Sequence, residues 1–328
     1  MNNRRKHIME PLRLNSPLKD YIWGGTRLKT EFGKSTSLER VAESWELSCH
    51  KDGPSLIENG DFAGKTLPEY IKIQGKSVLG TNCEKFDYFP ILIKLIDAQD
   101  NLSVQVHPDN NYALRVEGEY GKTEMWYIVD CAEGASLIYG FDHEISAEEF
   151  ARRIQDNTLL NVCNIVPVKK GDVFFIEAGT LHAIGKGILI AEIQQNSNTT
   201  YRVYDYGRVG ADGNPRQLHI EKAKEVTKRL PPTRDCRPLG PSEQRDGYIY
   251  TLLNQCEYFT VEHYEISQSA SLNATPESFH AVLAIDGSGT LCYGGRSYPL
   301  QKGDSYFIPA GIGSYSLKGK IDCIISRV

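Results

Sequence analysis

The sequence lacks long apolar segments. No run of apolar residues approaches the roughly 20 that a membrane-spanning helix requires, and the basic first residues, MNNRRKHIMEPLRLN, are not followed by the apolar segment of a secretion signal. Positive charge is not in excess either, because 37 Lys and Arg residues are set against 42 Asp and Glu residues. This balance argues against bulk binding to nucleic acid or to an anionic membrane. We therefore expect a cytoplasmic protein with neither of these partners.

Paired cysteines are also missing. The eight cysteines are scattered along 328 residues without a C-x-x-C pair. This spacing argues against a disulfide scaffold or a structural zinc knuckle and fits reduced, mostly buried thiols. The sequence contains no G-x-x-x-x-G-K-[ST] loop, so phosphate transfer from a nucleotide is not expected.

Short strand-like segments dominate what is present. They are rich in Val, Ile, Tyr and Phe and are bounded by Gly, Pro, Asn or Asp, which is typical of β-strands. Helical periodicity is confined to residues 67–74, 146–157 and 219–228, and the second of these opens with a capping-box pattern of Ser146 and Glu149. The pattern predicts a mainly β fold of the double-sheet barrel or jelly-roll type with a few short helices.

Two stretches nearly repeat each other. KKGDVFFIEAGTLHAIG (169–185) and LQKGDSYFIPAGIGSYSLKG (300–319) share the pattern G-D-x-aromatic-Phe-Ile-x-Ala-Gly. Upstream, SLIYG (136–140) matches TLCYG (290–294). The upstream pair is offset by 154 residues and the Gly-Asp pair by 132, so the first copy carries 22 extra residues, among them the predicted helix at 146–157. We infer two related barrels in tandem, with a helix inserted in the first.

The boundary between the two copies is marked by composition. Residues 230–246, LPPTRDCRPLGPSEQRD, are rich in proline and charge, as a linker is. We expect residues 1–235 to form the catalytic, metal-binding unit with its inserted helices. Residues 236–328 are expected to form a degenerate barrel without metal.

Four side chains of the first copy have the character of metal ligands. Gln105 and His107, in SVQVHPD, are two residues apart and so lie on one face of a strand. Glu124 begins the next predicted strand, and His182 ends the repeated element. In the second copy Ser314 replaces His182, and Ser278, or Glu277 after a one-residue slip, replaces Glu124.

The difference between the copies predicts that one barrel holds a metal ion and the other does not. Two imidazoles, a carboxylate and an amide oxygen suit Zn²⁺, or another divalent transition ion, with one position left for water or substrate. The alternative for each histidine is an interior residue that is hydrogen-bonded to its surroundings.

These residues resemble the cupin superfamily and, more narrowly, the short bacterial form of the type I mannose-6-phosphate isomerases (phosphomannose isomerases). The resemblance rests on YIWGG (21–25), AESWELSCH (42–50), FPILIKLIDAQDNLSVQVHPD (89–109), KTEMWYI (122–128), AGTLHAIGKG (178–187) and IQQNSNTTYRVYDYGR (193–208). It implies two tandem cupin-type jelly-roll barrels and one zinc ion bound by Gln105, His107, Glu124 and His182. The substrate would be a small sugar phosphate.

The resemblance also implies a pocket beside the metal. Arg202 matches the active-site arginine, Lys122 and Lys94 match pocket lysines, and Ser103 is implied to bind the phosphate. Glu192 matches an acidic residue that carries the proton in some proposals. The short form lacks the large helical domain of the long forms, so we expect the loops near Trp23 and Tyr204 to complete the wall, with Trp23 contacting substrate.

The implied reaction interconverts mannose 6-phosphate and fructose 6-phosphate through an enediol, by proton transfer between C2 and C1. It needs a base for the C–H next to the carbonyl and positive charge for the developing oxyanion. Glu192 is our candidate base, although a glutamate at this position could instead only hold a neighbouring Lys or Arg. His50 and Glu46 are weaker candidates, and both Glu43 and Glu46 are expected instead to be hydrogen-bonding supports. Arg208, in DYGR, is either a pocket residue or an ordinary surface arginine.

Two other functions fit the same residues. A non-catalytic, metal-containing cupin that binds a sugar phosphate would use the ion only to organise its pocket. A metal-dependent oxygenase would use iron and consume O₂. The Gln ligand and the pocket cations favour the phosphosugar isomerase, which we expect to be a monomer or a weak homo-oligomer.

Overall fold

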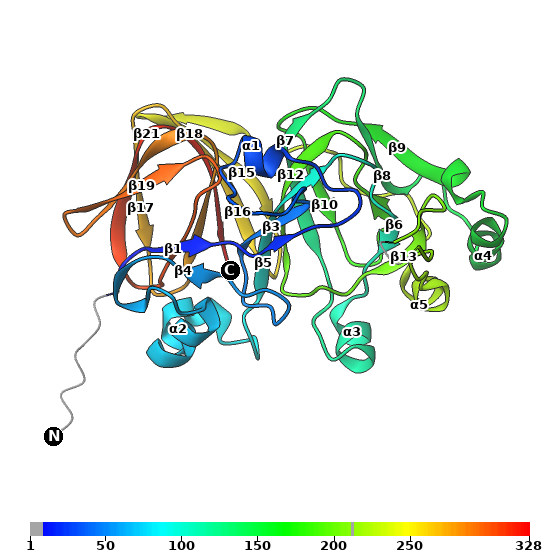
Figure 1. The fold of residues 1–328 in the computed structure, drawn as a ribbon, viewed down its shortest axis with the longest axis horizontal. Coiled ribbons are helices and arrows are strands. Elements are labelled where there is room, and N and C mark those ends of the chain that lie inside the picture. Colours follow the sequence, from blue (N-terminus) through cyan, green and yellow to red (C-terminus); the bar gives the residue numbers. More distant parts are fainter. Residues whose placement is uncertain (1–8, 211–212) are drawn as a thin grey trace.

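The structure is a computed structural model that describes residues 9–210 and 213–328 (Figure 1). Within these residues the strands form three sheets of six, five and ten strands. The fold is therefore mainly β, as predicted. Figure 1 shows two β-rich halves side by side, with the five-stranded sheet at one end and the ten-stranded sheet at the other.

Residues 18–204 supply the two smaller sheets. The six-stranded sheet has the order β10-β7-β12-β5-β3-β2, and the five-stranded sheet has the order β13-β6-β11-β8-β9. Their strands are β2 (Leu18–Lys19), β3 (Glu43–Leu47), β5 (Ile91–Ala98), β6 (Val104–Val106), β7 (Glu124–Cys131), β8 (Ser136–Phe141), β9 (Cys163–Pro167), β10 (Val173–Ile176), β11 (His182–Ala183), β12 (Ile188–Gln195) and β13 (Tyr201–Tyr204).

The ten-stranded sheet joins both ends of the chain. Its main path is β14-β15-β16-β21-β18-β20-β1-β4, with β17 paired to β21 and β19 paired to β18. Its strands are β1 (Leu12–Asn15), β4 (Leu56–Ile57), β14 (Ser242–Arg245), β15 (Tyr248–Gln255), β16 (Thr260–Ile266), β17 (Ser269–Ala274), β18 (His280–Tyr293), β19 (Arg296–Gln301), β20 (Ser305–Ile308) and β21 (Gly313–Arg327). Because β1 pairs with β20, the amino-terminal strand helps to complete the carboxyl-terminal half.

The helices are short and peripheral. The α-helices are α1 (Arg27–Thr30), α2 (Leu67–Gln74), α3 (Asn110–Val116), α4 (Ala147–Gln155) and α5 (Ile220–Val226), and the 3₁₀ turns are η1 (Gly60–Phe62), η2 (Lys76–Leu79), η3 (Thr81–Cys83) and η4 (Leu159–Val162). The predicted helices correspond to α2, α4 and α5. Phe150 of α4 and Ala223 of α5 pack into one apolar cluster with β6, β8 and β13, so these helices cover the outer face of the five-stranded sheet.

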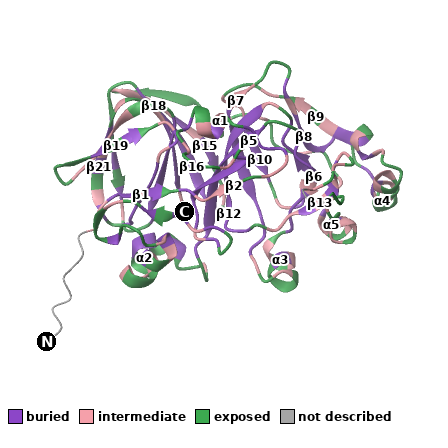
Figure 2. Ribbon diagram, viewed as in Figure 1, coloured by how far each residue is buried: buried purple, intermediate pink, exposed green. Residues whose placement is uncertain are grey.

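The six-stranded sheet is buried on both faces. Every residue of β5 and β12 is buried, which explains their nearly continuous apolar sequences. On one face Leu95 and Ile193 pack against the carboxyl-terminal half. On the other face Ile96 and Ile190 pack toward the five-stranded sheet. Figure 2 shows these central strands within the buried part of the molecule. A polar residue on this second face is therefore held between two sheets.

The repeated Gly-Asp element folds the same way twice. Gly171 and Gly303 both have φ of +91°, a conformation that favours glycine. The carboxylate of Asp172 accepts a hydrogen bond from Lys169 N at 2.9 Å, and Asp304 accepts one from Gln301 N at 2.8 Å. The sequence repeat is therefore also a structural repeat.

One prediction about the repeat is wrong. Glu124 lies opposite Ile176 in the β7–β10 pair, whereas His280 lies opposite Ile308 in the β18–β20 pair. Since Ile176 and Ile308 are 132 residues apart, as are the two Gly-Asp elements, His280 takes the place of Glu124. Neither Ser278 nor Glu277 does. The offset of 154 does not extend upstream to Glu124, because 12 positions separate Glu124 from Ser136 and only 10 separate His280 from Thr290.

At the His182 end of the repeat, the correspondence between the two copies is also displaced by one residue. Ser314 is exposed, although it aligns with the buried His182. Its neighbour Tyr315 is buried in the apolar core of the carboxyl-terminal half, and its hydroxyl lies 2.9 Å from His280 Nδ1. Because a shift of one residue moves a strand side chain to the other face, a tyrosine fills the interior position that a histidine occupies in the first copy.

The capping box predicted at α4 is only half formed. Ser146 accepts a hydrogen bond from Glu149 N at 3.0 Å. The Glu149 carboxylate does not return to Ser146 among the described contacts and instead accepts from Arg153 Nε at 2.8 Å. A complete box is present at α2, where Thr66 and Glu69 bond to each other's backbone N–H groups.

Candidate metal centre and substrate pocket

Strand pairing brings the four predicted ligands together between the two smaller sheets. His182, the first residue of β11, lies directly opposite Gln105 of β6, and His107 follows β6 directly. Glu124, the first residue of β7, reaches the same place from the six-stranded sheet. His107, Glu124 and His182 are buried, and one ligand atom of each lies within 4.8 Å of the others.

The distances within the cluster are short enough for shared ligands. Glu124 places Oε2 at 3.6 Å from His107 Nε2 and Oε1 at 3.5 Å from His182 Nε2. The Gln105 amide nitrogen lies 3.4 Å from His182 Nε2. Amide nitrogen and oxygen exchange by a half turn of the group, and that turn presents the Gln105 oxygen to the same centre.

Both histidines are oriented by backbone carbonyls. His107 Nδ1 lies 2.9 Å from Thr199 O, and His182 Nδ1 lies 2.9 Å from Thr180 O. A carbonyl oxygen can only accept, so each Nδ1 carries the proton and each Nε2 lone pair faces Glu124. Hydrogen bonds of this kind fix metal-ligating histidines in known sites.

The electrostatics keep the two imidazoles neutral. Burial, followed by the charge of Lys122, lowers the pKa of His182 to about 3 and holds the pKa of His107 well below its usual value. Burial also raises the pKa of Glu124, although Lys122 opposes this shift. Neutral imidazoles are the form that binds a metal ion.

Lys122 brings positive charge to this cluster. Its Nζ donates to His107 Nε2 at 3.0 Å and contacts Glu124 Oε2. It also lies 3.5 Å from Glu192 Oε1, and Lys94 Nζ lies 3.5 Å from the same oxygen. Burial disfavours the ionised form of Glu192, but Lys122 and then Lys94 outweigh it and lower the Glu192 pKa. Glu192 is therefore a buried carboxylate held between two ammonium groups.

A cavity of about 300 Å³ opens beside the cluster. Its lining includes each residue that the sequence assigned to catalysis or substrate binding, together with one predicted ligand: Trp23, Lys94, Ser103, Gln105, Lys122, Glu192 and Arg202. The other three predicted ligands are not among its lining residues, but Lys122 contacts His107 and Glu124, and Gln105 contacts His182. Within the cavity Arg202 Nε donates to Ser103 Oγ at 3.1 Å, which joins the arginine to the serine implied to bind phosphate.

The lining also contains residues that sequence reasoning misses. Tyr21, Thr200 and Arg216 are among them. Glu43 is the support that the sequence predicts, since it accepts a hydrogen bond from Trp45 Nε1 at 2.8 Å, but it also faces the pocket. Arg216 comes from the loop between β13 and α5, where no periodic pattern marks it. Tyr204 is not among the described lining residues, so this loop completes the wall through a different residue from the one expected.

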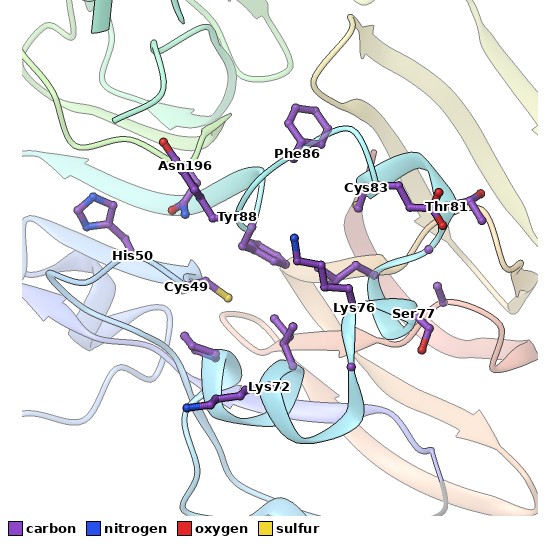
Figure 3. A pocket seen from close by; sticks show the side chains of 18 of the residues that line it. Cys49, His50, Lys72, Lys76, Ser77, Thr81, Cys83, Phe86, Tyr88 and Asn196 are labelled. Atoms are coloured by element: carbon purple, nitrogen blue, oxygen red, sulfur yellow. The ribbon is translucent and has the colours of Figure 1, made fainter. Parts of the chain in front are cut away.

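The two weaker candidate bases lie elsewhere. Glu46 is fully buried and accepts from Ser16 Oγ and Lys34 Nζ, each at 2.8 Å. His50 faces Glu119, with 3.6 Å between Nε2 and Oε1. It lines a separate groove of about 920 Å³, in which Figure 3 shows it beside Cys49 and Tyr88. Neither side chain belongs to the pocket beside the metal cluster.

Comparisons with known proteins agree with this geometry. Residues 12–127 match a family model described as phosphomannose isomerase type I, catalytic domain, and residues 248–328 match one described as mannose-6-phosphate isomerase, cupin domain. The chain is 40% identical over 320 residues to mannose-6-phosphate isomerase ManA of Bacillus subtilis, a match that covers 97% of this chain and 99% of that protein. It is 42% identical to the mannose-6-phosphate isomerase of Streptococcus mutans over 98% of this chain and 99% of that protein.

A solved structure is similar along the whole chain. The crystal structure of the mannose 6-phosphate isomerase from Bacillus subtilis matches with a TM-score of 0.90 and 39% identity, covering 98% of this chain and all of that one. A point mutant of the phosphomannose isomerase from Salmonella typhimurium, at 17% identity and a TM-score of 0.73, has the same fold over 96% of this chain and 98% of that one.

Proposed function

The chain belongs to the type I mannose-6-phosphate isomerase family, and on that premise we propose how its residues interconvert mannose 6-phosphate and fructose 6-phosphate. The enzyme is an aldose–ketose isomerase. The observation that carries its mechanism is the cluster of His107, Glu124 and His182 at the edge of a pocket that also holds Glu192.

The metal is proposed to be a single Zn²⁺ held by Gln105, His107, Glu124 and His182. Nitrogen and oxygen ligands without a thiolate suit a catalytic rather than a structural zinc site. The fit is supported by Glu124 Oε1, which is buried without a hydrogen-bond partner among the described residues, because a buried acceptor of this kind is costly unless something binds it. When bound, the ion supplies Lewis-acid stabilisation of negative charge on a substrate oxygen. The Lys122 ammonium would compete with it for Glu124.

Glu192 is proposed to move the proton. It is ionised, since its pKa is lowered, and it lies in the pocket wall. Its Oε1 is 3.5 Å from each lysine nitrogen, too far for a strong hydrogen bond, so one acceptor is available to take the proton from C2 and return it to C1. Lys122 or Arg202 could stabilise the enediol oxygens as a fixed cation; we assign this role to Lys122, because Arg202 donates to Ser103 on the phosphate side of the pocket.

The phosphate is proposed to bind Ser103, Arg202 and Lys94. A sugar phosphate carries nearly two negative charges at neutral pH, and charge-assisted hydrogen bonds from Arg and Lys suit them. Trp23, buried beside Tyr21 with ring centroids 5.6 Å apart, would pack against the sugar.

We propose four further assignments, which concern the architecture, the division into domains, the location and the oligomeric state. The halves are interpreted as two tandem cupin-type jelly rolls, the first catalytic (1–235) and the second degenerate and without metal (236–328). The replacement of Glu124 and His182 by His280 and Tyr315 in the second half supports this division. No helix in the described residues is long and apolar enough to cross a membrane. A cytoplasmic location and a monomeric or weakly oligomeric state complete the proposal.

The alternative of a non-catalytic cupin that binds a sugar phosphate is not favoured, because the relatives that match the whole chain are named isomerases. The test is an assay of fructose 6-phosphate formation joined to elemental analysis. We expect about one zinc per chain, loss of turnover after chelation and recovery on adding Zn²⁺. His107→Ala is expected to lose metal and turnover together. Full turnover without bound metal would contradict the proposal.

A further inference from the structure

Three arginines gather beside the substrate pocket around a single carboxylate. The charged groups that act on Arg202 are Arg216, Asp205 and Arg208. Burial and the two neighbouring cations lower the pKa of Arg202, and among the described residues only Asp205 opposes them. Asp205 is itself buried, with 6% of its surface exposed. Counted over the described residues, three guanidinium groups and one carboxylate give an excess of two positive charges at this end of the pocket.

Asp205 holds two of these arginines in fixed positions. It accepts from Arg216 Nε at 2.7 Å and from Arg216 Nη2 at 2.5 Å, which is a two-point fork. The same carboxylate accepts from Arg208 Nη2 at 2.6 Å. Paired N–H···O bonds of this kind fix the plane of a guanidinium as well as its position.

The two arginines, Arg208 and Arg216, differ in which of their guanidinium nitrogens already donate hydrogen bonds. Arg208 uses Nε on Asp205 O, Nη2 on the Asp205 carboxylate and Nη1 on Asn101 O, and it is not among the described residues that line the pocket. Arg216 commits Nε and Nη2 to Asp205, and its side chain lines the pocket together with Ser103 and Arg202. Arg216 Nη1 is thus the nitrogen not committed to Asp205.

We propose that Arg216 is a phosphate-binding residue of the pocket and that Asp205 is the positioning residue that aims it. The ligand group is the dianionic phosphate of the substrate, whose charge matches the excess of two. Arg202, whose Nε already donates to Ser103 Oγ, and Arg216 would contact the same phosphate. This inference rests on the proposed binding of a sugar phosphate in this pocket.

The phosphate is remote from the carbons that exchange hydrogen, so we expect its contact with Arg216 to be about as strong in the ground state as in the transition state. Loss of such uniform binding raises KM and leaves kcat nearly unchanged. We therefore expect Arg216→Gln to raise KM for mannose 6-phosphate about 10- to 100-fold, the loss that removal of a hydrogen bond to a charged group brings. The inhibition constant of inorganic phosphate should rise by a similar factor.

The matched control is Arg237→Gln, which removes the same charge from an exposed arginine that is not among the residues lining the pocket. Arg216→Lys keeps the charge but not the fork and should give an intermediate KM, which serves if the glutamine variant does not fold. Asp205→Asn should raise KM with little change in kcat, because it weakens the paired contact that positions Arg216 while the Arg216 side chain remains.

Binding of inorganic phosphate measured by calorimetry separates this inference from the proposed function. Weaker phosphate binding by Arg216→Gln than by Arg237→Gln supports the inference even if turnover is absent in the unmodified enzyme. Equal phosphate affinity and equal KM in the two variants would overturn it. A fall in kcat at unchanged KM would also overturn it, because Arg216 would then act on the reacting carbons.

Discussion

Glu192 and Glu124 are two carboxylates whose neighbouring side chains suit them to different roles. Both are buried and both lie close to Lys122. Glu124 also contacts two imidazoles, whereas Glu192 lies between two ammonium groups. The first arrangement suits a ligand and the second an ionised base.

Glu192→Gln is expected to lower kcat by a factor of about 10² to 10⁴, the usual contribution of a general base. KM and metal content should change little, because the amide keeps the shape and Glu192 is not among the clustered ligand atoms. Steady-state kinetics and elemental analysis measure the three quantities. Glu133→Gln, an exposed substitution of the same type, is the control. A variant that keeps about a tenth of the normal kcat would assign the proton transfer to another group.

Sequence reasoning reaches the four proposed ligands for a physical reason, whereas the other pocket residues are expected only from the family resemblance. The Q-x-H spacing on a strand, and the loss of His182 from the second copy, both follow from chain geometry that can be read in one sequence. Arg216 cannot be reached in this way, because it lies in a loop whose position depends on Asp205 rather than on any periodicity. The slip that puts His280 in place of Glu124 is also hidden in the sequence, because the first copy has two more residues between Glu124 and Ser136 than the second has between His280 and Thr290.

At the scale of elements, neighbouring side chains of strand β12 face opposite sides of the sheet. Stability and catalysis therefore depend on different residues of the same strand. Ile193 packs toward the carboxyl-terminal half, and its neighbour Glu192 faces the pocket. Ile193→Ala is expected to lower the free energy of unfolding by about 2–5 kcal/mol, as a cavity in a packed core does, with kcat nearly unchanged. Denaturant unfolding and kinetics check the two parts.

The control is Ile165→Ala on the edge strand β9, where 59% of the residue is exposed. It should cost about 0.5 kcal/mol or less, as surface substitutions usually do. Equal losses at the two positions would show that the central sheet is less tightly packed than its burial indicates.

Element ends are predictable where local chemistry decides them. Helix α2 spans the predicted residues 67–74 because Thr66 and Glu69 form its capping box and Gly75 follows its last residue. Helix α3 escapes sequence reasoning, since it is only seven residues long and is capped by Asp109 alone. The pairing of β1 with β20 is also beyond reach, because strands so far apart in the chain show no signal of contact in a single sequence.

For the whole molecule, acid is expected to destabilise the carboxyl-terminal half. Burial lowers the pKa of His280 to about 4, whereas the unfolded value is about 6.5. Between these values the unfolded chain binds a proton that the folded one does not, so the free energy of unfolding falls as pH drops from about 6.5 to 4. The total loss is roughly 3 kcal/mol for this group.

His280→Gln should flatten the dependence of the free energy of unfolding on pH within that window. His143→Gln is the control, because it removes an exposed histidine from outside the carboxyl-terminal half. Denaturant titrations at several pH values give the slopes. Identical slopes for the two variants would contradict the assignment to His280.

The six-stranded sheet has the candidate metal cluster on one side and the carboxyl-terminal core on the other. A divalent ion at a hundred times its dissociation constant adds about 2.7 kcal/mol to the folded state by mass action. Because both sides of the sheet share one set of strands, we expect this stabilisation to extend beyond the four ligands. Amide hydrogen exchange in β16 and β21, which contribute none of the four ligands, is expected to slow when zinc is added and to quicken when it is withdrawn.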